Sequence, residues 1–377
     1  MTTIHGAPSY QLSSDWVDLS VTQTAGMLAP VTFHLDGTEC SPYALAPWEP
    51  DQIDASLPPL LKYLRGDFFC LPFGPQDDGE PHGDTANGDW SLVEKTDKSL
   101  HLAIEPGDTG GRIEKLFSLR DAEAAIYCEH RISGVEGRFS YGTHPVLDLS
   151  NLAEGQGRVT TSPFRWGSVN PGLFSDPANH EFQILVPGAT FTELSSVPMA
   201  SRAPTSAENV ETAGSADLTR YPSRQGFEDL IMLVNEAASE SQPFAWTACV
   251  FDRYLWFSLK NPAEFPSTLF WMSNGGRKSA PWNGTHLARL GLEEVCSHFA
   301  DNVTSSRQDK LSSQNIPTTR AFSVDETVSL RIVQAAAAVP DDFGAVASIA
   351  PRGEGGVTIT GENGTTVEVS IDWGFVS

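Results

Sequence analysis

The feature that most constrains the fold is a series of short segments with strand character, separated by clusters of turn-forming residues. Residues 31–35, 100–104, 126–132 and 182–186 are rich in β-branched and aromatic side chains or alternate apolar with polar ones. Clusters of Gly, Pro and Asp lie between such segments, most clearly at 74–81 and 105–111. No amphipathic helical stretch of several turns is present, so the sequence predicts an all-β protein with antiparallel sheets.

The second half of the chain adds three expectations. Residues 357–360 and 366–371 flank a Gly-Glu-Asn-Gly turn and predict a hairpin. Residues 326–339 contain an alanine run that favours helix, but Val328, Leu330 and Ile332 alternate with polar residues, and we therefore expect a strand. The segment near 195–226 is poor in large apolar residues, which predicts a long surface loop within one domain spanning 1–377.

Charge and cysteine content limit the partners. The chain has 48 acidic and 24 basic residues, a formal charge of −24, which disfavours nucleic acid and membrane surfaces. The same charge argues against a phosphorylated ligand unless a local patch such as Arg277 and Lys278 counters it. Five scattered cysteines indicate small buried residues in a reducing compartment, and no targeting or membrane-spanning segment is visible. We expect a cytoplasmic monomer or homodimer that binds a neutral small molecule.

Two histidines and an arginine stand in contexts that suit a binding site. Arg65 and His82 are each followed by glycine, which permits a ligand to approach the backbone closely. His144 stands before a proline at an expected strand start, and it is able to act as an acid or base near neutral pH. The structural alternatives are an ordinary turn with an exposed His82, and a hydrogen-bonded structural role for His144.

The segment 269–298 contains a second group of candidates. Trp271 and Trp282 offer flat surfaces on which the apolar face of a sugar ring can stack, although isolated tryptophans are more often core residues. Glu293 and Glu294 are adjacent on an expected strand, so one carboxylate points inward and the other outward. A one-residue change of register exchanges the two, and both remain candidates.

The order of these segments resembles the aldose 1-epimerase (galactose mutarotase-like) superfamily, in one of its less-characterised branches. The resemblance spans nearly the whole chain and is carried, in order, by Ser41-Pro-Tyr, Ala46-Pro-Trp, Arg65-Gly, Leu71-Pro-Phe-Gly, His82-Gly, Trp90, Gly142-Thr-His-Pro, Trp271 and Leu292-Glu. It implies a large two-sheet antiparallel β supersandwich with a cleft that binds a small-molecule carbohydrate.

The resemblance also implies roles for the candidate residues. Glu293 is expected to be the base at the anomeric hydroxyl and His144 the acid at the ring oxygen, about one sugar ring apart across the cleft. Ring opening and reclosure then interconvert the two anomers without a metal or organic cofactor. The substrate-binding residues expected around this pair are His82, Arg65, Trp271, Asn274 and Trp282.

Two other functions are compatible with the same residues. One is a carbohydrate-binding protein that keeps the cleft without catalysis. The other is a metal site built from His82, His144 and Glu293, because two histidines and a carboxylate suit zinc or iron. The chain lacks short ligand spacings such as H-x-H or H-E-x-x-H, so the metal site ranks lowest.

Overall fold

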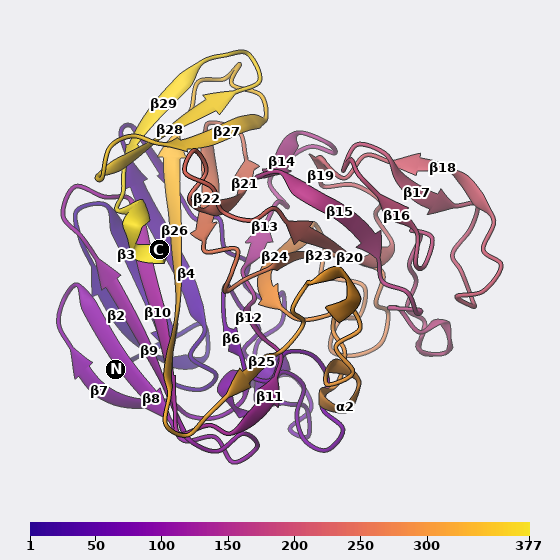
Figure 1. Ribbon diagram of the computed structural model, residues 1–377, viewed down its shortest axis with the longest axis horizontal. Coiled ribbons are helices and arrows are strands. Elements are labelled where there is room, and N and C mark those ends of the chain that lie inside the picture. The colour runs from indigo at the N-terminus through magenta and orange to yellow at the C-terminus, as the bar shows by residue number, and fades with distance from the viewer.

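Strands build almost all of the regular structure. The computed structural model describes residues 1–377, and its 29 strands form two large sheets and several small ones (Figure 1). The only α-helices are the four-residue α1 (Pro59–Lys62) and α2 (Val303–Ser306). Four 3₁₀ turns complete the list: η1 (Asp84–Ala86), η2 (Pro177–Asn179), η3 (Ser312–Gln314) and η4 (Trp373–Val376). The predicted all-β fold is confirmed.

The larger sheet has nine strands, and every neighbouring pair is antiparallel. Its order across the sheet is β19 (Arg220–Tyr221), β14 (Gly157–Thr161), β21 (Ala245–Val250), β22 (Tyr254–Lys260), β26 (Thr327–Ala338), β10 (Ala125–Ser133), β9 (Arg112–Leu119), β8 (Ser99–Ile104) and β7 (Ser91–Lys95). The central strand β26 joins a half of the sheet that comes early in the sequence to a half that comes later.

The second large sheet has eight strands and carries three of the seven candidate site residues, namely Trp271, Asn274 and Glu293. Its order is β16 (Thr190–Phe191), β15 (Phe164–Val169), β20 (Phe227–Asn235), β23 (Ser267–Asn274), β24 (Arg289–Cys296), β12 (Tyr141–Thr143) and β6 (Phe69–Cys70), with β13 (Val146–Asp148) also paired to β24. Strand β24 therefore lies between β23, which carries Trp271, and the strands β12 and β13, which flank His144.

Smaller sheets surround these two. A five-stranded sheet at the N-terminus comprises β1 (Thr2–Ile4), β2 (Ala7–Ser13), β3 (Val17–Thr22), β4 (Leu28–Leu35) and β5 (Thr38–Cys40). Two-stranded sheets pair β11 (Gly137–Phe139) with β25 (Arg320–Phe322), and β17 (Val197–Ala200) with β18 (Thr212–Ala216). The C-terminal sheet of β27 (Val346–Pro351), β28 (Gly356–Gly361) and β29 (Thr366–Ser370) lies at one end of the molecule (Figure 1).

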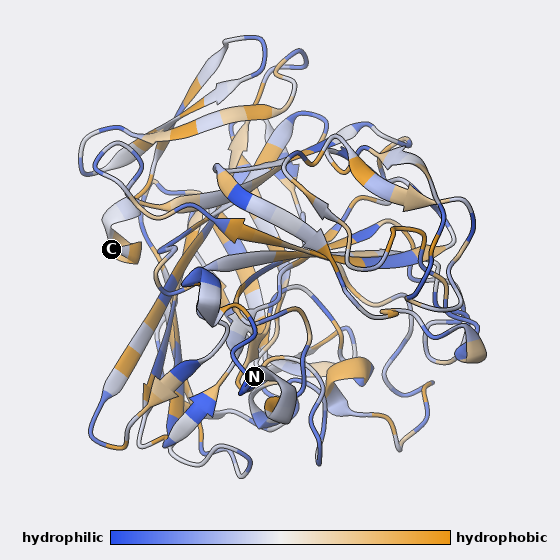
Figure 2. Cartoon of the chain, turned by 45° about the vertical axis from the view of Figure 1, so that its right-hand side comes forward, coloured by the Kyte–Doolittle hydropathy of each residue, from blue (hydrophilic) through white to orange (hydrophobic).

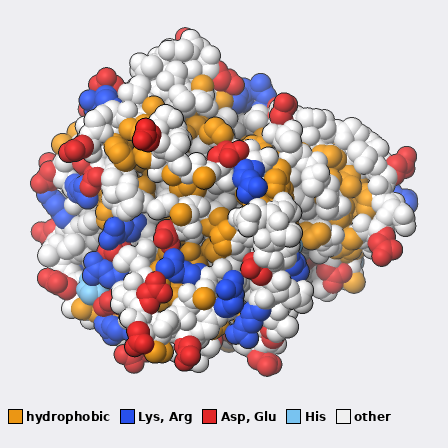
Figure 3. Space-filling view, viewed as in Figure 1, with side chains coloured by type: hydrophobic (Ala, Val, Ile, Leu, Met, Phe, Trp, Pro, Cys, Tyr) orange, Lys and Arg blue, Asp and Glu red, His pale blue; other side chains and the backbone are white.

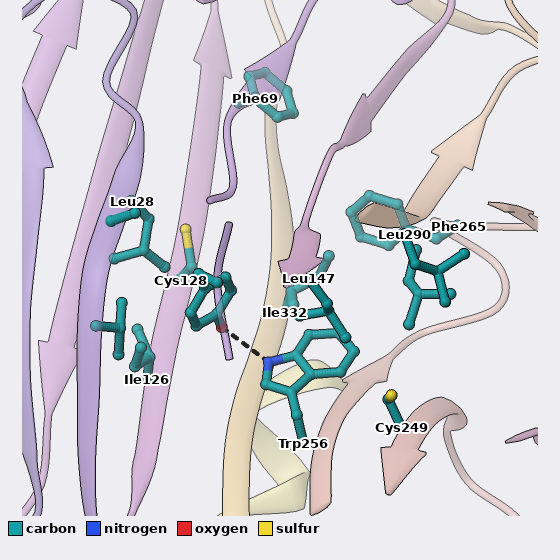
Figure 4. Close-up of a cluster of buried hydrophobic side chains, with 14 of the residues drawn as sticks. Leu28, Phe69, Ile126, Cys128, Leu147, Cys249, Trp256, Phe265, Leu290 and Ile332 are labelled. Atoms are coloured by element: carbon teal, nitrogen blue, oxygen red, sulfur yellow. Dashed lines mark hydrogen bonds between the residues drawn. The ribbon is translucent and has the colours of Figure 1, made fainter. Parts of the chain in front are cut away.

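Three apolar clusters hold the sheets together, and the apolar stretches along the inner strands are visible in Figure 2. The largest, of 55 buried residues, joins the nine-stranded, eight-stranded and N-terminal sheets; Figure 4 shows part of it around Trp256 and Ile332. A second cluster packs the opposite face of the nine-stranded sheet against the C-terminal sheet. The third covers the outer face of the eight-stranded sheet with α1 and nearby loops.

Most local predictions are confirmed. Strand β26 (Thr327–Ala338) covers all but the two end residues of the ambiguous segment 326–339, and β28 and β29 form the predicted hairpin. Two predictions are wrong in part. Residues 182–186 do not form a strand. The backbone N–H groups of Ile184 and Leu185 donate to the Asp229 carboxylate instead of to a neighbouring strand. The segment 195–226 is not a continuous loop, since it contains the short strands β17, β18 and β19.

The surface and the cysteines agree with the composition. Acidic side chains are spread over the face seen in Figure 3. All five cysteines are unpaired and buried, as expected. The structure contains no helix with the length and apolar character needed to cross a bilayer.

Candidate active site

The two adjacent glutamates of β24 point to opposite faces of the eight-stranded sheet. Glu294 faces the interior between the two large sheets, where it is fully buried and pairs with Lys260 of β22. Glu293 faces outward into a cavity. Gly291 lies on the same face as Glu293, and a Cβ at this glycine would lie 2.8 Å from Glu293 Oε1. The glycine thus leaves room for the Glu293 carboxyl, and the register places Glu293, not Glu294, at the site.

The cavity has a volume of about 310 Å³ and lies between the outer face of the eight-stranded sheet and the segments that cover it. Ten of its sixteen lining residues are hydrophobic. The lining residues that can exchange a proton or carry a charge are His82, His144, Arg277 and Glu293. A concave, mostly apolar space with a few converging polar groups is the usual form of a small-molecule site.

His144 and Glu293 are in direct proximity inside this cavity. The imidazole Nε2 lies 3.2 Å from Glu293 Oε1, and both side chains are at least nine-tenths buried. The expected separation of one sugar ring between them is therefore wrong, since the two groups stand side by side. His144 Nδ1 is buried and has no hydrogen-bond partner.

A chain of buried hydrogen bonds holds the backbone at His144. The His144 N–H donates to Asp67 Oδ1 at 2.8 Å, and Gln334 of β26 donates to Asp67 Oδ2 at 2.6 Å. Tyr43 in turn donates to Gln334 Oε1 and accepts from Trp256 Nε1, the bond drawn in Figure 4. Because each member is buried and partnered, this chain fixes the position of His144 from the core of the sandwich.

Aromatic rings enclose the pair. Phe68 stacks on the His144 ring at 4.5 Å between centroids, and Trp271 meets the same ring edge-on at 5.5 Å. The His82 ring lies 5.5 Å from that of His144, and its Nδ1 accepts from the backbone N–H of Gly74. Trp282 stands edge-on to Trp271 at 5.9 Å. Four of the predicted residues around Glu293, namely His82, His144, Trp271 and Trp282, are thus brought together.

Burial shifts the pKa values of the acid–base groups toward their neutral forms. Desolvation, and secondarily the charge of Glu294, raises the pKa of Glu293 well above its ordinary value. Desolvation, with a smaller effect of His82, lowers the pKa of His144 well below its ordinary value. Desolvation also lowers the pKa of His82 to about 4. Burial in the cavity therefore favours the uncharged forms of both Glu293 and His144.

Two predicted substrate-binding residues do not line the cavity. Arg65 is buried, and its guanidinium donates to the carbonyl oxygens of Ile4, His5 and Tyr63, so it ties the N-terminus to the fold. Asn274 donates to the Ser223 carbonyl and accepts from the Ala288 N–H. Because these backbone groups already occupy the hydrogen-bonding atoms of both side chains, neither side chain is available to a ligand in the cavity. Likewise, His82, His144 and Glu293 do not form a group of three potential metal ligands.

Sequence reasoning overlooked three residues of functional interest. Arg277 lines the cavity, although in the sequence it drew attention only as part of a surface patch with Lys278. Asp67 positions His144, and the signal for it was its place directly after Arg65-Gly. Glu228 is fully buried beside Trp271, whose indole N–H it accepts at 3.3 Å. Nothing in the sequence around Glu228 distinguishes it from an ordinary strand residue.

Comparison with known proteins gives a structural likeness but no sequence relative. No protein-family model matches the chain, and no curated protein matches it. A galactose mutarotase related enzyme from Lactobacillus acidophilus superposes with a TM-score of 0.53 at 9% identity, over 89% of this chain and 98% of the other. A protein from Escherichia coli K12, provisionally described as an aldose 1-epimerase, superposes with a TM-score of 0.54 at 16% identity, over 89% of this chain and 100% of the other.

The Slr1438 protein from Synechocystis sp. PCC 6803 is similar to the same extent, with a TM-score of 0.52 and 14% identity over 89% of this chain and 98% of the other. These likenesses extend over most of the chain and nearly all of each solved structure. At such low identity they concern the fold and not the chemistry. The chain has the galactose mutarotase-like fold, a β supersandwich built on two large antiparallel sheets.

Proposed function

We propose that this protein interconverts the anomers of a sugar or sugar derivative, as an aldose 1-epimerase does. The observation that carries the proposal is the buried pair of Glu293 and His144, 3.2 Å apart at the wall of a partly open cavity. The fold supports it, because the same fold occurs in structures described as mutarotase-related and aldose 1-epimerase proteins.

The side-by-side arrangement suits the chemistry of an anomeric centre. The anomeric hydroxyl and the ring oxygen are bonded to the same carbon, so an acceptor and a donor that act on both must themselves be close together. One group removes the hydroxyl proton while the other protonates the ring oxygen, and the bond from C1 to the ring oxygen breaks. Rotation about the C1–C2 bond and reclosure, with both protons returned, give the other anomer.

Each of the two groups is able both to give and to take a proton, so the step balances with either one as the base. Burial raises the pKa of Glu293 and lowers that of His144, which favours Glu293 as the donor to the ring oxygen and His144 as the acceptor of the hydroxyl proton, opposite to the roles that the family resemblance implies. During reclosure the two groups exchange roles, so each complete cycle restores their starting protonation states.

The walls of the cavity suit a pyranose ring. Trp271 and Trp282 both line the cavity with their rings at 82° to each other, and Trp271 lies edge-on to His144. We assign His82 a positioning role, because its Nδ1 already accepts a hydrogen bond from the Gly74 N–H while its ring lines the cavity.

Saturation-transfer NMR on a panel of aldoses and their derivatives tests this proposal. The purified protein should accelerate exchange between anomeric proton signals of at least one sugar, and His144→Gln should reduce the acceleration by a factor of about 100 or more. Unaltered acceleration in His144→Gln would contradict the proposal. Saturable binding without acceleration for any sugar would instead identify a carbohydrate-binding protein.

A further inference from the structure

Arg277 is the one permanently charged cation that lines the cavity. It follows the end of β23 through Gly275 and Gly276, and the backbone passes so close to Glu228 that a Cβ at Gly276 would lie 2.4 Å from the Glu228 nitrogen. This turn directs the guanidinium over three aromatic rings, at 4.8 Å from Trp282, 5.3 Å from Phe174 and 5.5 Å from Trp271.

The side chain of Arg277 forms no hydrogen bond or ion pair within the protein. Its Nε is buried without a hydrogen-bond acceptor, and its guanidinium takes part in no ion pair. Glu228 is the carboxyl group whose charge interacts with it, but the Glu228 oxygens already accept from Ser273, Trp271 and the Gly276 N–H. Burial also raises the pKa of Glu228 to about 7, so this carboxyl is a weak counter-ion at neutral pH.

The neighbouring lining makes this unpaired cation unusual. Leu60, Leu61, Leu64, Phe68 and Phe73 line the same cavity, and none can accept a hydrogen bond through its side chain. Arg277 is half-buried, and the aromatic faces stabilise its cation only in part. A ligand that brings an oxyanion would satisfy the free donors of the guanidinium.

We propose that the sugar bound in this cavity is anionic, with an oxyanion that pairs with Arg277 while the ring lies against the tryptophans. This inference rests on the proposed function and adds the substrate class to it. The planar fork of a guanidinium matches a carboxylate in two parallel hydrogen bonds, and a phosphate offers the same oxyanion chemistry. Because the whole chain carries a net charge of −24, selection of an anion depends on this local contact.

Lys278 provides a matched control. It is the next residue along the chain and has the same charge, but it is exposed and does not line the cavity. Replacing either residue with methionine therefore changes the net charge equally. Arg277→Met also keeps an apolar stem over the tryptophans, and Arg277→Lys keeps the charge while removing the planar fork.

Isothermal titration calorimetry with glucose, glucuronate and glucose 6-phosphate tests the inference. We expect the wild-type protein to bind at least one anionic sugar tenfold or more tightly than glucose. Tighter binding of glucuronate identifies a carboxylate as the preferred group, and tighter binding of glucose 6-phosphate identifies a phosphate. Arg277→Met should abolish this preference, Arg277→Lys should weaken it, and Lys278→Met should preserve it. A thermal unfolding scan on each variant verifies that it is folded.

Three results would overturn the inference. Equal affinity for glucose and the anionic sugars, or a preference that persists in Arg277→Met, refutes the anionic substrate class and leaves the proposed epimerase function standing. Binding of none of the three refutes an anionic glucose derivative as the ligand, and the aldose panel then decides the proposed epimerase function separately.

Discussion

The adjacent residues Glu293 and Glu294 provide a sensitive test of the structure, because the same substitution at neighbouring positions should have opposite consequences. Glu294→Gln removes the partner of the fully buried Lys260. Glu294 also accepts from the hydroxyl groups of Thr247, Ser258 and Thr268, so an amide in its place leaves one hydrogen-bond donor facing others. Glu293→Gln replaces a carboxyl whose pKa is already raised by burial with a neutral group of the same shape.

The expected magnitudes differ enough to measure. Removing one partner of a buried ion pair costs about 3–5 kcal/mol. With an unfolding entropy of about 2.1 cal/mol/K per residue, a chain of 377 residues has roughly 0.8 kcal/mol/K in total. Glu294→Gln should therefore lower Tm by about 5 °C. Glu293→Gln should change the free energy of unfolding by less than about 1 kcal/mol, and hence Tm by about 1 °C or less.

Differential scanning calorimetry of the two single variants at pH 7 measures both shifts. Combining Glu294→Gln with Lys260→Met removes both buried charges, and this double variant should recover at least half of the lost Tm. Equal losses in the two single variants would refute the assignment of the two carboxylates to opposite faces. A double variant less stable than Glu294→Gln alone would refute the explanation by an unpaired Lys260.

Three further predictions concern residues around the site. Asp67→Asn should lower kcat tenfold or more with KM unchanged, because Asp67 holds the backbone of His144. Adding Gln334→Glu should restore part of the rate, since the new carboxylate accepts from the asparagine amide in place of the original bond from Gln334 to Asp67. An absence of rescue argues against a positioning role. Burial raises the pKa of Glu228 to about 7, so its contribution to stability is present below pH 4.5 and is lost as pH rises through 7. In urea unfolding, the free energy of unfolding of Glu228→Gln should rise by about 3 kcal/mol relative to that of the wild type between pH 4.5 and 8. A difference that stays constant over this range contradicts the prediction. Gly66→Ala should cost more than about 2 kcal/mol in the same assay, because the glycine has a φ of 47° and a Cβ would lie 1.7 Å from the Leu28 carbonyl oxygen; a cost below 0.5 kcal/mol contradicts it.

The sequence was informative where periodicity alone decides the structure. Strand β26 was predicted against its alanine run, because Val328, Leu330 and Ile332 alternate toward the core between the sheets. Alternation along β24 also places Glu293 and Glu294 on opposite faces of the sheet. Which of the two faces the cavity depends on the register of β24 with β23. That register is set by long-range pairing and is not visible in a local pattern.

The limits of sequence reasoning are clearest for the arginines. Arg65 follows a motif that resembles a substrate site, yet three carbonyl oxygens, two of them from the N-terminus, occupy its guanidinium. Arg277 was described only by its charge, although Trp271 and Trp282 lie within six residues of it in sequence. Its place over their rings and over the distant Phe174 depends on the turn after β23 and on tertiary packing. Local composition identifies the residue type, whereas tertiary contacts decide whether its donors are free.

The central claim is that Glu293 and His144 exchange protons with an anomeric centre. Its most direct test is the rate at which a freshly dissolved single anomer of the tightest-binding sugar reaches equilibrium, followed by polarimetry at equal concentrations of folded wild type, Glu293→Gln and Glu294→Gln. We predict acceleration over buffer by wild type, a rate near that of buffer for Glu293→Gln, and a rate near that of wild type for folded Glu294→Gln. Undiminished acceleration by Glu293→Gln would contradict the claim.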